Sequence, residues 1–243
     1  MKPSKPKALI SWSSGKDSAF ALHEVRRAGE FDVVGALTTV TETFERVSIH
    51  GVRQEILLAQ LDAAGLSPRI VPIPYPCPNE VYEARMGKAV AEAVQDGITH
   101  IIFGDLYLAD IRTYREQKLA GTGIAPVFPL WQRPTLPLAH AMIANGLEAW
   151  LATVDLKHLP AEFAGRKFHL SLLADLPEGV DPCGENGEFH TCVVAGPIFS
   201  RALAVRTGER VERDGYAYCD LVMEPTLAEG EDKVLTPAAS HRP

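Results

Sequence analysis

The chain has few cysteines and no long apolar run. Its four cysteines (Cys77, Cys183, Cys192 and Cys219) show no zinc-type spacing and indicate no disulfide framework. The basic N-terminus MKPSKPK is followed only by a short apolar stretch that Ser and Trp interrupt, so it has neither the pattern of a signal peptide nor that of a membrane span. We therefore expect a cytoplasmic protein with no membrane contact.

Basic residues are also fewer than acidic residues. The chain carries 24 Lys and Arg against 31 Asp and Glu, a net charge of −7. Nucleic-acid binding depends on basic side chains that neutralise phosphates, so the composition argues against a nucleic-acid partner. The hydrophobic content of 46% and the length of 243 residues suit one large globular domain, or a core domain with a smaller one.

The stretch 7–18, KALISWSSGKDS, is the clearest signal in the sequence. An apolar run leads into a Ser/Gly turn that opens a helical pattern. The free N–H groups and the dipole of a helix start favour an anion, and Lys16 adds a positive charge. The stretch therefore predicts a phosphate-binding loop, made of Ser13, Ser14, Gly15, Lys16, Asp17 and Ser18.

Two common phosphate loops are excluded. A Walker A loop requires Gly where this chain has Ile10, and a magnesium-binding hydroxyl where it has Asp17. The dinucleotide-binding fingerprint fails because the glycines are missing.

The first half of the chain alternates strand and helix signals, which predicts a parallel sheet of five strands with helices on both faces. The predicted strands are the apolar run 8–10 and the segments 32–40, 69–73, 98–103 and 124–128. The predicted helices are 16–28, 51–64, one that runs to about residue 95 with Asn79 as its N-cap, and 110–120. Gly104 and Asp105 follow the fourth strand directly. Because ligands bind beyond the carboxyl ends of parallel strands, we expect them to share one site with the phosphate loop.

Around Leu130 the pattern changes. The sequence predicts a helix over 137–145, a partly helical segment over 159–173, strands over 147–154, 191–195 and 216–223, and turns at 206–208 and 213–215. We therefore expect a nucleotide-binding domain over 1–130, a smaller α+β substrate domain over 131–224, and a disordered tail over 225–243.

A second polar cluster, DPCGENGEFHT, spans 181–191. Taken alone, its composition favours a solvated acidic turn over a functional site. The spacing of Cys183, His190 and Cys192 is not a zinc pattern.

The phosphate loop resembles the SGGKDS loop of the PP-loop ATP pyrophosphatases, which cleave ATP to AMP and pyrophosphate. Ser14 stands where that loop has its first glycine. If this position requires a positive φ, Ser carries a conformational penalty that Gly would not.

Together, the two motifs resemble the diphthine–ammonia ligase family, whose second motif is G-E-x-G-E-[FY]-x-T. Matching positions, in order from about 7 to 200, are His50-Gly51, Gly104-Asp105, Arg112, Arg115, Glu116, Pro129-Leu130-Trp131, Gly184-Glu185, Gly187-Glu188-Phe189 and Thr191. Beyond about residue 200 we recognise little resemblance.

The resemblance implies a HUP-type, Rossmann-like domain and a smaller C-terminal α+β domain. It implies ATP-dependent amidation of diphthine, a modified histidine of elongation factor 2, through an acyl-adenylate. With no glutaminase segment in the sequence, free ammonium is the expected nitrogen source. We expect ATP and Mg2+ to be required.

The resemblance also suggests roles for individual residues. The catalytic candidates are Lys16, Asp17, Glu185 and Glu188. Beside the phosphate loop, the nucleotide-binding candidates are Thr38, His50, Gly104 and Asp105. The substrate-binding candidates are Arg112, Glu185, Glu188 and Thr191. Asp17 is expected either to bind Mg2+ with ATP or to fix the loop.

The sequence leaves two alternatives open. In the first, the chain is a PP-loop enzyme that acts on another acceptor, such as a small carboxylate or tRNA. In the second, it is a non-catalytic sensor that binds ATP or AMP.

Overall fold

The computed structural model describes residues 4–48 and 50–224. Its first sheet has six strands, and the parallel strands run in the order β4-β2-β1-β5-β6, with a short β3 antiparallel to β2. The strands are β1 Lys7–Ser11, β2 Asp32–Thr41, β3 Arg46–Val47, β4 Ser67–Ile73, β5 His100–Ile102 and β6 Ala125–Val127. Strand β3, which the sequence did not predict, spans too few residues to show a period of its own.

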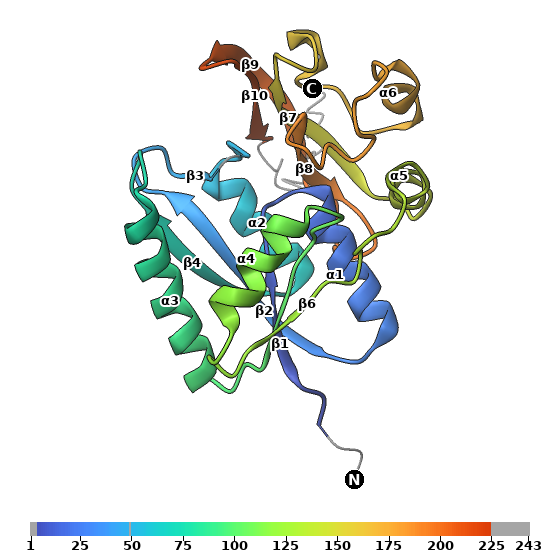
Figure 1. Ribbon diagram of the computed structural model, residues 1–243. Coiled ribbons are helices and arrows are strands. Elements are labelled where there is room, and N and C mark those ends of the chain that lie inside the picture. Colours follow the sequence, from blue (N-terminus) through green and yellow to red (C-terminus); the bar gives the residue numbers. More distant parts are fainter. Residues whose placement is uncertain (1–3, 49, 225–243) are drawn as a thin grey trace, which may run out of the picture.

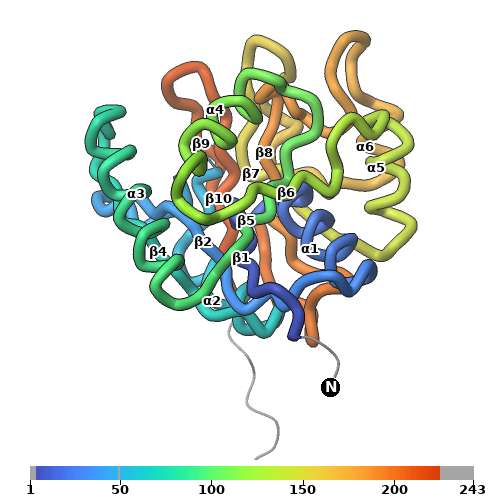
Figure 2. The backbone as a smooth tube through the Cα atoms, turned by 60° about the horizontal axis from the view of Figure 1, so that its bottom comes forward, coloured from blue at the N-terminus to red at the C-terminus, as the bar shows by residue number. Residues whose placement is uncertain are grey.

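Helices cover both faces of this sheet (Figure 2). They are α1 Lys16–Ala28, α2 Gln54–Ala64, α3 Asn79–Gln95 and α4 Ala109–Leu119. Side chains alternate along β1, so Ala8 and Ile10 join the core on the α1–α2 side. Leu9 joins the core under α3 and α4. The arrangement confirms the predicted α/β class.

The second sheet is antiparallel, in the order β8-β7-β10-β9. Its elements are α5 Thr135–Ala144, β7 Glu148–Asp155, the 3-10 helix η1 Ala161–Phe163, α6 Leu170–Asp175, β8 Phe189–Ala195, β9 Val205–Arg213 and β10 Tyr216–Met223. Figure 1 shows this sheet beyond the carboxyl ends of the parallel strands. The second sheet therefore lies over the edge where a ligand of the parallel sheet would bind.

One hydrophobic core joins the two sheets. Phe20 and Leu22 of α1 belong to the same cluster as Leu151 of β7 and Val193 of β8. A continuous apolar contact of this kind favours a fixed arrangement of the two parts. The division of roles between 1–130 and 131–224 stays a prediction, and the expected tail at 225–243 lies outside the described residues.

Local signals predicted some boundaries and missed others. Helix α1 has the predicted bounds, and Gly29 ends it at φ 70° with its N–H bonded to Val25 O. The prediction of Asn79 as N-cap is wrong, since extended Pro78 takes that position and Asn79 is the first helical residue. Within the described ranges, no helix is both long and apolar enough to span a bilayer.

Of the two predicted turns in the last part, one is confirmed. Asp214 and Gly215 have φ values of 53° and 82° and join β9 to β10 in a tight hairpin. The predicted turn at 206–208 is wrong, because these residues lie inside β9. There the pairing with β10 overrides the local turn preference of Thr207-Gly208.

Candidate active site

The phosphate loop connects β1 to α1 at the carboxyl edge of the sheet, where β1 lies between β2 and β5. Hydroxyl groups close the loop on itself. The Ser18 hydroxyl donates to Gly15 O at 3.0 Å and lies 3.3 Å from Ser13 Oγ. Gly15 N–H in turn donates to Ser13 Oγ at 3.4 Å. These bonds fix the shape of the loop at the start of α1, and a helix N-terminus attracts anions.

Ser14 occupies a left-handed conformation, with φ 68°. It is fully buried, and its hydroxyl has no hydrogen-bond partner in the described part of the chain. The surroundings enforce this conformation, because Ser14 O accepts from Val193 N at 2.9 Å and from Gln60 Nε2 at 3.2 Å. The position thus has the positive φ on which the predicted penalty for Ser depends.

The loop after β5 packs directly on the start of α1. A Cβ on Gly104 would lie 2.8 Å from the backbone of Asp17 and of Ser18, so only glycine fits there without a shift. Asp105 pairs with Arg115 of α4, with Nε 3.0 Å from Oδ1. The structure therefore brings Gly104 to the phosphate loop, as the shared strand edge predicted, whereas Asp105 turns to Arg115 of α4.

The two sequence motifs meet at the start of α1. Lys16 N–H donates to Thr191 Oγ1 at 3.0 Å, and Val193 N–H donates to Ser14 O. Helix α1 has Gly15 as its N-cap and no side-chain cap of its own. Thr191, from β8 of the second sheet, therefore satisfies a helix N–H that would otherwise be unpaired.

Lys16 points into this junction. Its side chain is buried, and Nζ donates to Asp17 Oδ2 at 2.8 Å and to Cys183 O. The rings of Phe168 and Phe189 lie 5.6 and 5.4 Å from Nζ. Burial alone would lower the pKa of Lys16, but nearby carboxylates, Asp17 foremost, outweigh it and raise the pKa. Lys16 therefore stays charged and fastens the 181–191 loop to α1.

The two glutamates of the second motif have different surroundings. Glu185 Oε1 accepts the N–H groups of Leu106 at 2.7 Å and Tyr107 at 3.4 Å. Burial is the main cause that raises the pKa of Glu185 to about 7. Glu188 is buried within its own loop, where Oε1 accepts from Asp181 N at 3.0 Å and Asn186 Nδ2 at 2.9 Å. Glu185 faces the other loops, whereas Glu188 shapes the turn.

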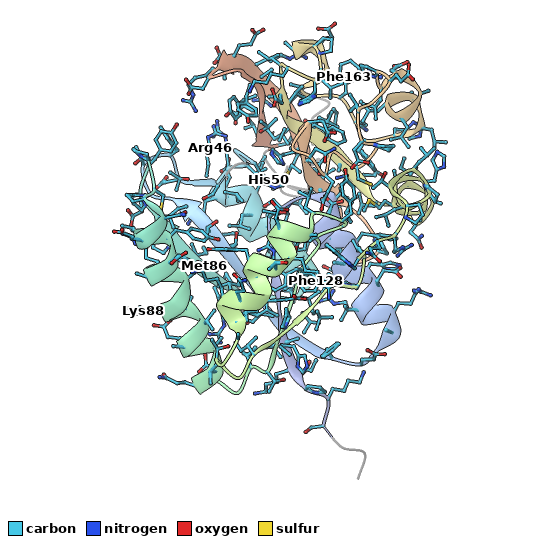
Figure 3. The ribbon with its side chains drawn as sticks, in the orientation of Figure 1. Arg46, His50, Met86, Lys88, Phe128 and Phe163 are labelled. Atoms are coloured by element: carbon cyan, nitrogen blue, oxygen red, sulfur yellow. The ribbon has the colours of Figure 1, made fainter. Side chains whose placement is uncertain are left out.

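Two histidine rings, His50 and His190, lie against each other at the same junction, tilted by 40° and with centroids 4.7 Å apart. His50 Nδ1 lies 3.1 Å from Thr191 O, and its Cε1 would be 2.8 Å from a Cβ on Gly15. Burial lowers the pKa of His50 to about 4 and that of His190 to about 3. Both rings are therefore neutral at pH 7. Figure 3 shows His50 between the two sheets.

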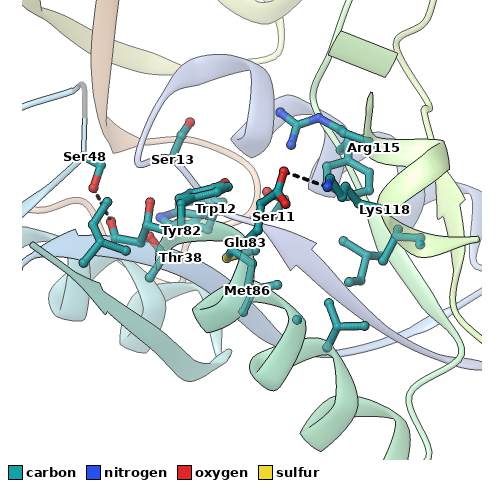
Figure 4. A pocket seen from close by; sticks show the side chains of 18 of the residues that line it. Ser11, Trp12, Ser13, Thr38, Ser48, Tyr82, Glu83, Met86, Arg115 and Lys118 are labelled. Carbon is teal, nitrogen blue, oxygen red and sulfur yellow. Dashed lines mark hydrogen bonds and ion pairs between the residues drawn. The ribbon is translucent and has the colours of Figure 1, made fainter. Parts of the chain in front are cut away.

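A cavity of about 830 Å3 lies between the sheet and helices α3 and α4 and extends to the phosphate loop at the carboxyl ends of β1 and β2 (Figure 4). Ser13, Thr38 and His50 line it, and the buried Thr38 Oγ1 has no partner among the described residues. Across the cavity an ion pair joins Lys118 of α4 to Glu83 of α3 at 2.6 Å. The volume lies in the range of small-molecule and cofactor sites.

The cavity lining contains residues that the sequence prediction missed, among them Trp12, Tyr82, Arg115 and Lys118. Arg112 instead stacks on Phe128 and Trp131, with its guanidinium carbon 4.7 Å from both ring centroids. Arg112 and Arg115 lie nearly one turn apart on α4, and helical phase alone did not show which of them faces the cavity.

No cluster of three or more His, Cys, Asp or Glu in the described segments is arranged to hold a metal ion. One atom nonetheless suits a cation that arrives with ATP. Asp17 Oδ1 is buried without a hydrogen-bond partner among the residues described. The predicted role of Asp17 beside magnesium fits this atom.

A hydroxyl-rich loop at the carboxyl edge of a parallel sheet, next to a cavity of this size, is typical of α/β proteins that bind a phosphorylated ligand. Comparison with known proteins then narrows the class. Residues 135–224 match the family model described as the diphthamide synthase C-terminal domain. The match extends past residue 200, where the sequence analysis recognised little, and corrects that limit.

Curated relatives agree with this match. The chain is 30% identical over 134 residues to diphthine–ammonia ligase of Danio rerio, covering 52% of each chain. It is 32% identical over 118 residues to the Rattus norvegicus protein of the same name, covering 46% of this chain and 44% of that one. The alignments thus span about half the length of these relatives. The chain is thus similar in sequence to diphthine–ammonia ligases, the family that its two motifs resemble.

Among solved structures, the chain is similar to U34-tRNA thiolase NcsA from Methanococcus maripaludis, with a TM-score of 0.36 and 14% identity over 58% of each chain.

Proposed function

We propose that the protein is an AMP-forming carbon–nitrogen ligase that activates a carboxylate with ATP and then amidates it with ammonium. We further propose diphthine on elongation factor 2 as the acceptor. The observation that carries the proposal is the contact between the two loops, in which Lys16 N–H donates to Thr191 Oγ1 and Val193 N–H to Ser14 O. The loop that would cleave ATP and the loop that resembles the acceptor motif form one site.

The chemistry explains why such a site is needed. A carboxylate does not react with ammonia, because oxide would have to leave. Transfer of AMP to the carboxylate releases pyrophosphate, and the resulting anhydride has AMP as its leaving group. The N-terminus of α1, with the hydroxyls of Ser13 and Ser18, would stabilise the charge that grows on pyrophosphate. Mg2+ would neutralise phosphate charge when bound, with Asp17 Oδ1 beside it.

Glu185 is the proposed proton acceptor of the second step. Attack of ammonia on the acyl-adenylate forms the C–N bond, breaks the bond to AMP and releases a proton. A base with a pKa near the working pH is the most effective in such a transfer, and the pKa of Glu185 is about 7. Glu188, enclosed in its own turn, would instead keep the loop in shape.

The test is an AMP assay with purified protein, ATP, Mg2+ and ammonium, with and without elongation factor 2 that carries diphthine. The proposal predicts AMP and pyrophosphate in equal amounts, and amidated factor only when all components are present. AMP with a small carboxylate or tRNA in place of the factor would contradict the acceptor. ATP binding without AMP formation would contradict the ligase and leave the sensor alternative.

A further inference from the structure

A second cavity of about 700 Å3 lies between the two sheets. Residues on β3, on the segment between β4 and α3, and on the β9–β10 hairpin line it. Val47, Ser48 and Ile73 line both this cavity and the nucleotide cavity, so the two adjoin. A molecule held in the second cavity would therefore lie next to the cavity beside the phosphate loop.

Aromatic rings gather in this second cavity. The rings of Phe44 and Tyr75 meet edge to face with centroids 5.2 Å apart, and their side chains are 43% and 59% exposed. Tyr218 of β10 lines the same cavity. Large aromatic side chains left exposed in a recess between two parts of a chain are typical of a binding site.

The chain itself shows what kind of group these rings attract. The guanidinium carbon of Arg213 lies 5.6 Å from the ring centroid of Phe44 and 5.6 Å from that of Tyr218. A cation therefore already lies within reach of two ring faces. The Arg213 side chain is 59% exposed at the end of β9, so it can leave without disturbing the core.

The charged side chains deepest around the cavity are already paired, whereas the exposed carboxylate of Glu212, which also lines it, forms no ion pair among the described residues. Asp220 accepts from Arg46 at 3.0 Å and from Arg53 at 2.6 Å. Arg53 also lies 3.7 Å from Glu55, and Arg213 lies 3.6 Å from Asp214. A ligand cation that needs a carboxylate partner would find Asp220 occupied. A cation without N–H groups needs no such partner and interacts with ring faces instead.

We propose that Phe44, Tyr75 and Tyr218 bind a quaternary ammonium group, which displaces the Arg213 guanidinium. The assignment of this group to the acceptor rests on the proposed function, because diphthine carries a trimethylammonium group beside its carboxylate. Because the carboxylate and the nitrogen share one carbon, the proposal places the carboxylate beside the rings, on the side of Val47 and Ser48 that both cavities share.

The first test is calorimetric titration of the full chain with choline and with 3,3-dimethylbutan-1-ol, which has the same shape and no charge. We expect choline to bind about tenfold more tightly, since a partly desolvated cation–π contact contributes about that factor. Tyr75→Leu should weaken choline binding several-fold. Equal affinities for choline and the alcohol would overturn the proposal.

Replacement of Arg213 tests whether choline affinity rises or falls when the resident cation is removed. Arg213→Ala removes the resident cation and should strengthen choline binding about threefold or more. Arg210→Ala is the matched control, because it removes an exposed arginine from the same strand but leaves the rings unchanged. If Arg213→Ala weakens choline binding, or changes it no more than Arg210→Ala does, the cavity is not a cation site.

The acceptor assay separates this inference from the proposed function. Tyr75→Leu should raise the KM for diphthine-bearing factor several-fold and leave the KM for ATP unchanged. An unchanged acceptor KM together with normal AMP formation would overturn the inference alone. Choline binding without any AMP formation would overturn the proposed function alone.

Discussion

Replacement of Ser14 by glycine should stabilise the protein, although it removes a buried side chain. Ser14 has a φ of 68° and a buried hydroxyl without a partner in the described ranges. A left-handed conformation costs a residue with a Cβ about 1–2 kcal/mol. A buried hydroxyl with no partner costs a further 1–3 kcal/mol, roughly.

Two effects oppose this gain. Glycine increases the entropy of the unfolded chain by about 0.5–1 kcal/mol, and the lost hydroxymethyl group leaves a small void. The net expectation for Ser14→Gly is a free energy of unfolding that is higher by about 1–2 kcal/mol. For a chain of this size, the melting temperature should rise by about 3–6 °C.

Urea denaturation of the wild type, Ser14→Gly and Gln132→Gly measures the effect. Gln132 also has a positive φ, 59°, but it is exposed and has no buried hydroxyl. Its replacement by glycine therefore measures the energy of the left-handed backbone conformation without the contribution of a buried hydroxyl. Its expected gain is below about 1 kcal/mol, because relief of strain and unfolded-state entropy nearly cancel. A Ser14→Gly protein less stable than the wild type would refute the interpretation of this position as strained.

Three further predictions concern the junction between the loops. Lys16→Met should destabilise the fold by about 3 kcal/mol in urea denaturation, because Asp17 loses its buried partner. The double variant Lys16→Met/Asp17→Asn should recover most of this loss. If it recovers none, Lys16 and Asp17 do not stabilise the fold as an ion pair. Burial raises the pKa of Glu185 from 4.5 to about 7, so between these pH values the native state holds a proton that the unfolded state has lost. The contribution of Glu185 to stability is therefore complete below pH 4.5 and is lost as the pH rises through 7. Glu185→Gln should therefore remove part of the fall in stability between pH 4.5 and 7, and an unchanged pH profile would contradict the shift. Thr191→Val should cost about 1 kcal/mol in thermal unfolding through the lost cap on Lys16 N–H, whereas Thr191→Ser should keep the bond; equal losses would show that the hydroxyl has no such role.

Local patterns predicted the features that depend on nearby residues. The apolar run 8–10, the small residues of the loop and Gly29 together set β1, the turn and both ends of α1. The strand–helix alternation predicted the parallel sheet, and the sheet in turn explains why Gly104 lies against the loop.

Contacts between distant residues were not predictable in the same way. The direction of the Lys16 side chain depends on Cys183 O, on Phe189 of β8 and on Phe168 just before α6, none of which a window around the loop contains. The choice of Arg115 over Arg112 at the cavity depends on how α4 packs over the sheet. The turn expected at 206–208 gave way to pairing with β10, a tertiary effect that overrides local preference.

The most direct test of the proposed activity is pyrophosphate exchange into ATP, measured without ammonium. With labelled pyrophosphate, ATP and diphthine-bearing elongation factor 2, adenylylation of the acceptor is reversible and should place label in ATP. The label should appear only when the acceptor is present, and Asp17→Asn should reduce it, because this change weakens the cation position at Oδ1. Labelled ATP without acceptor would contradict an acyl-adenylate on the acceptor. Amidation with formation of ADP instead of AMP would contradict the central claim.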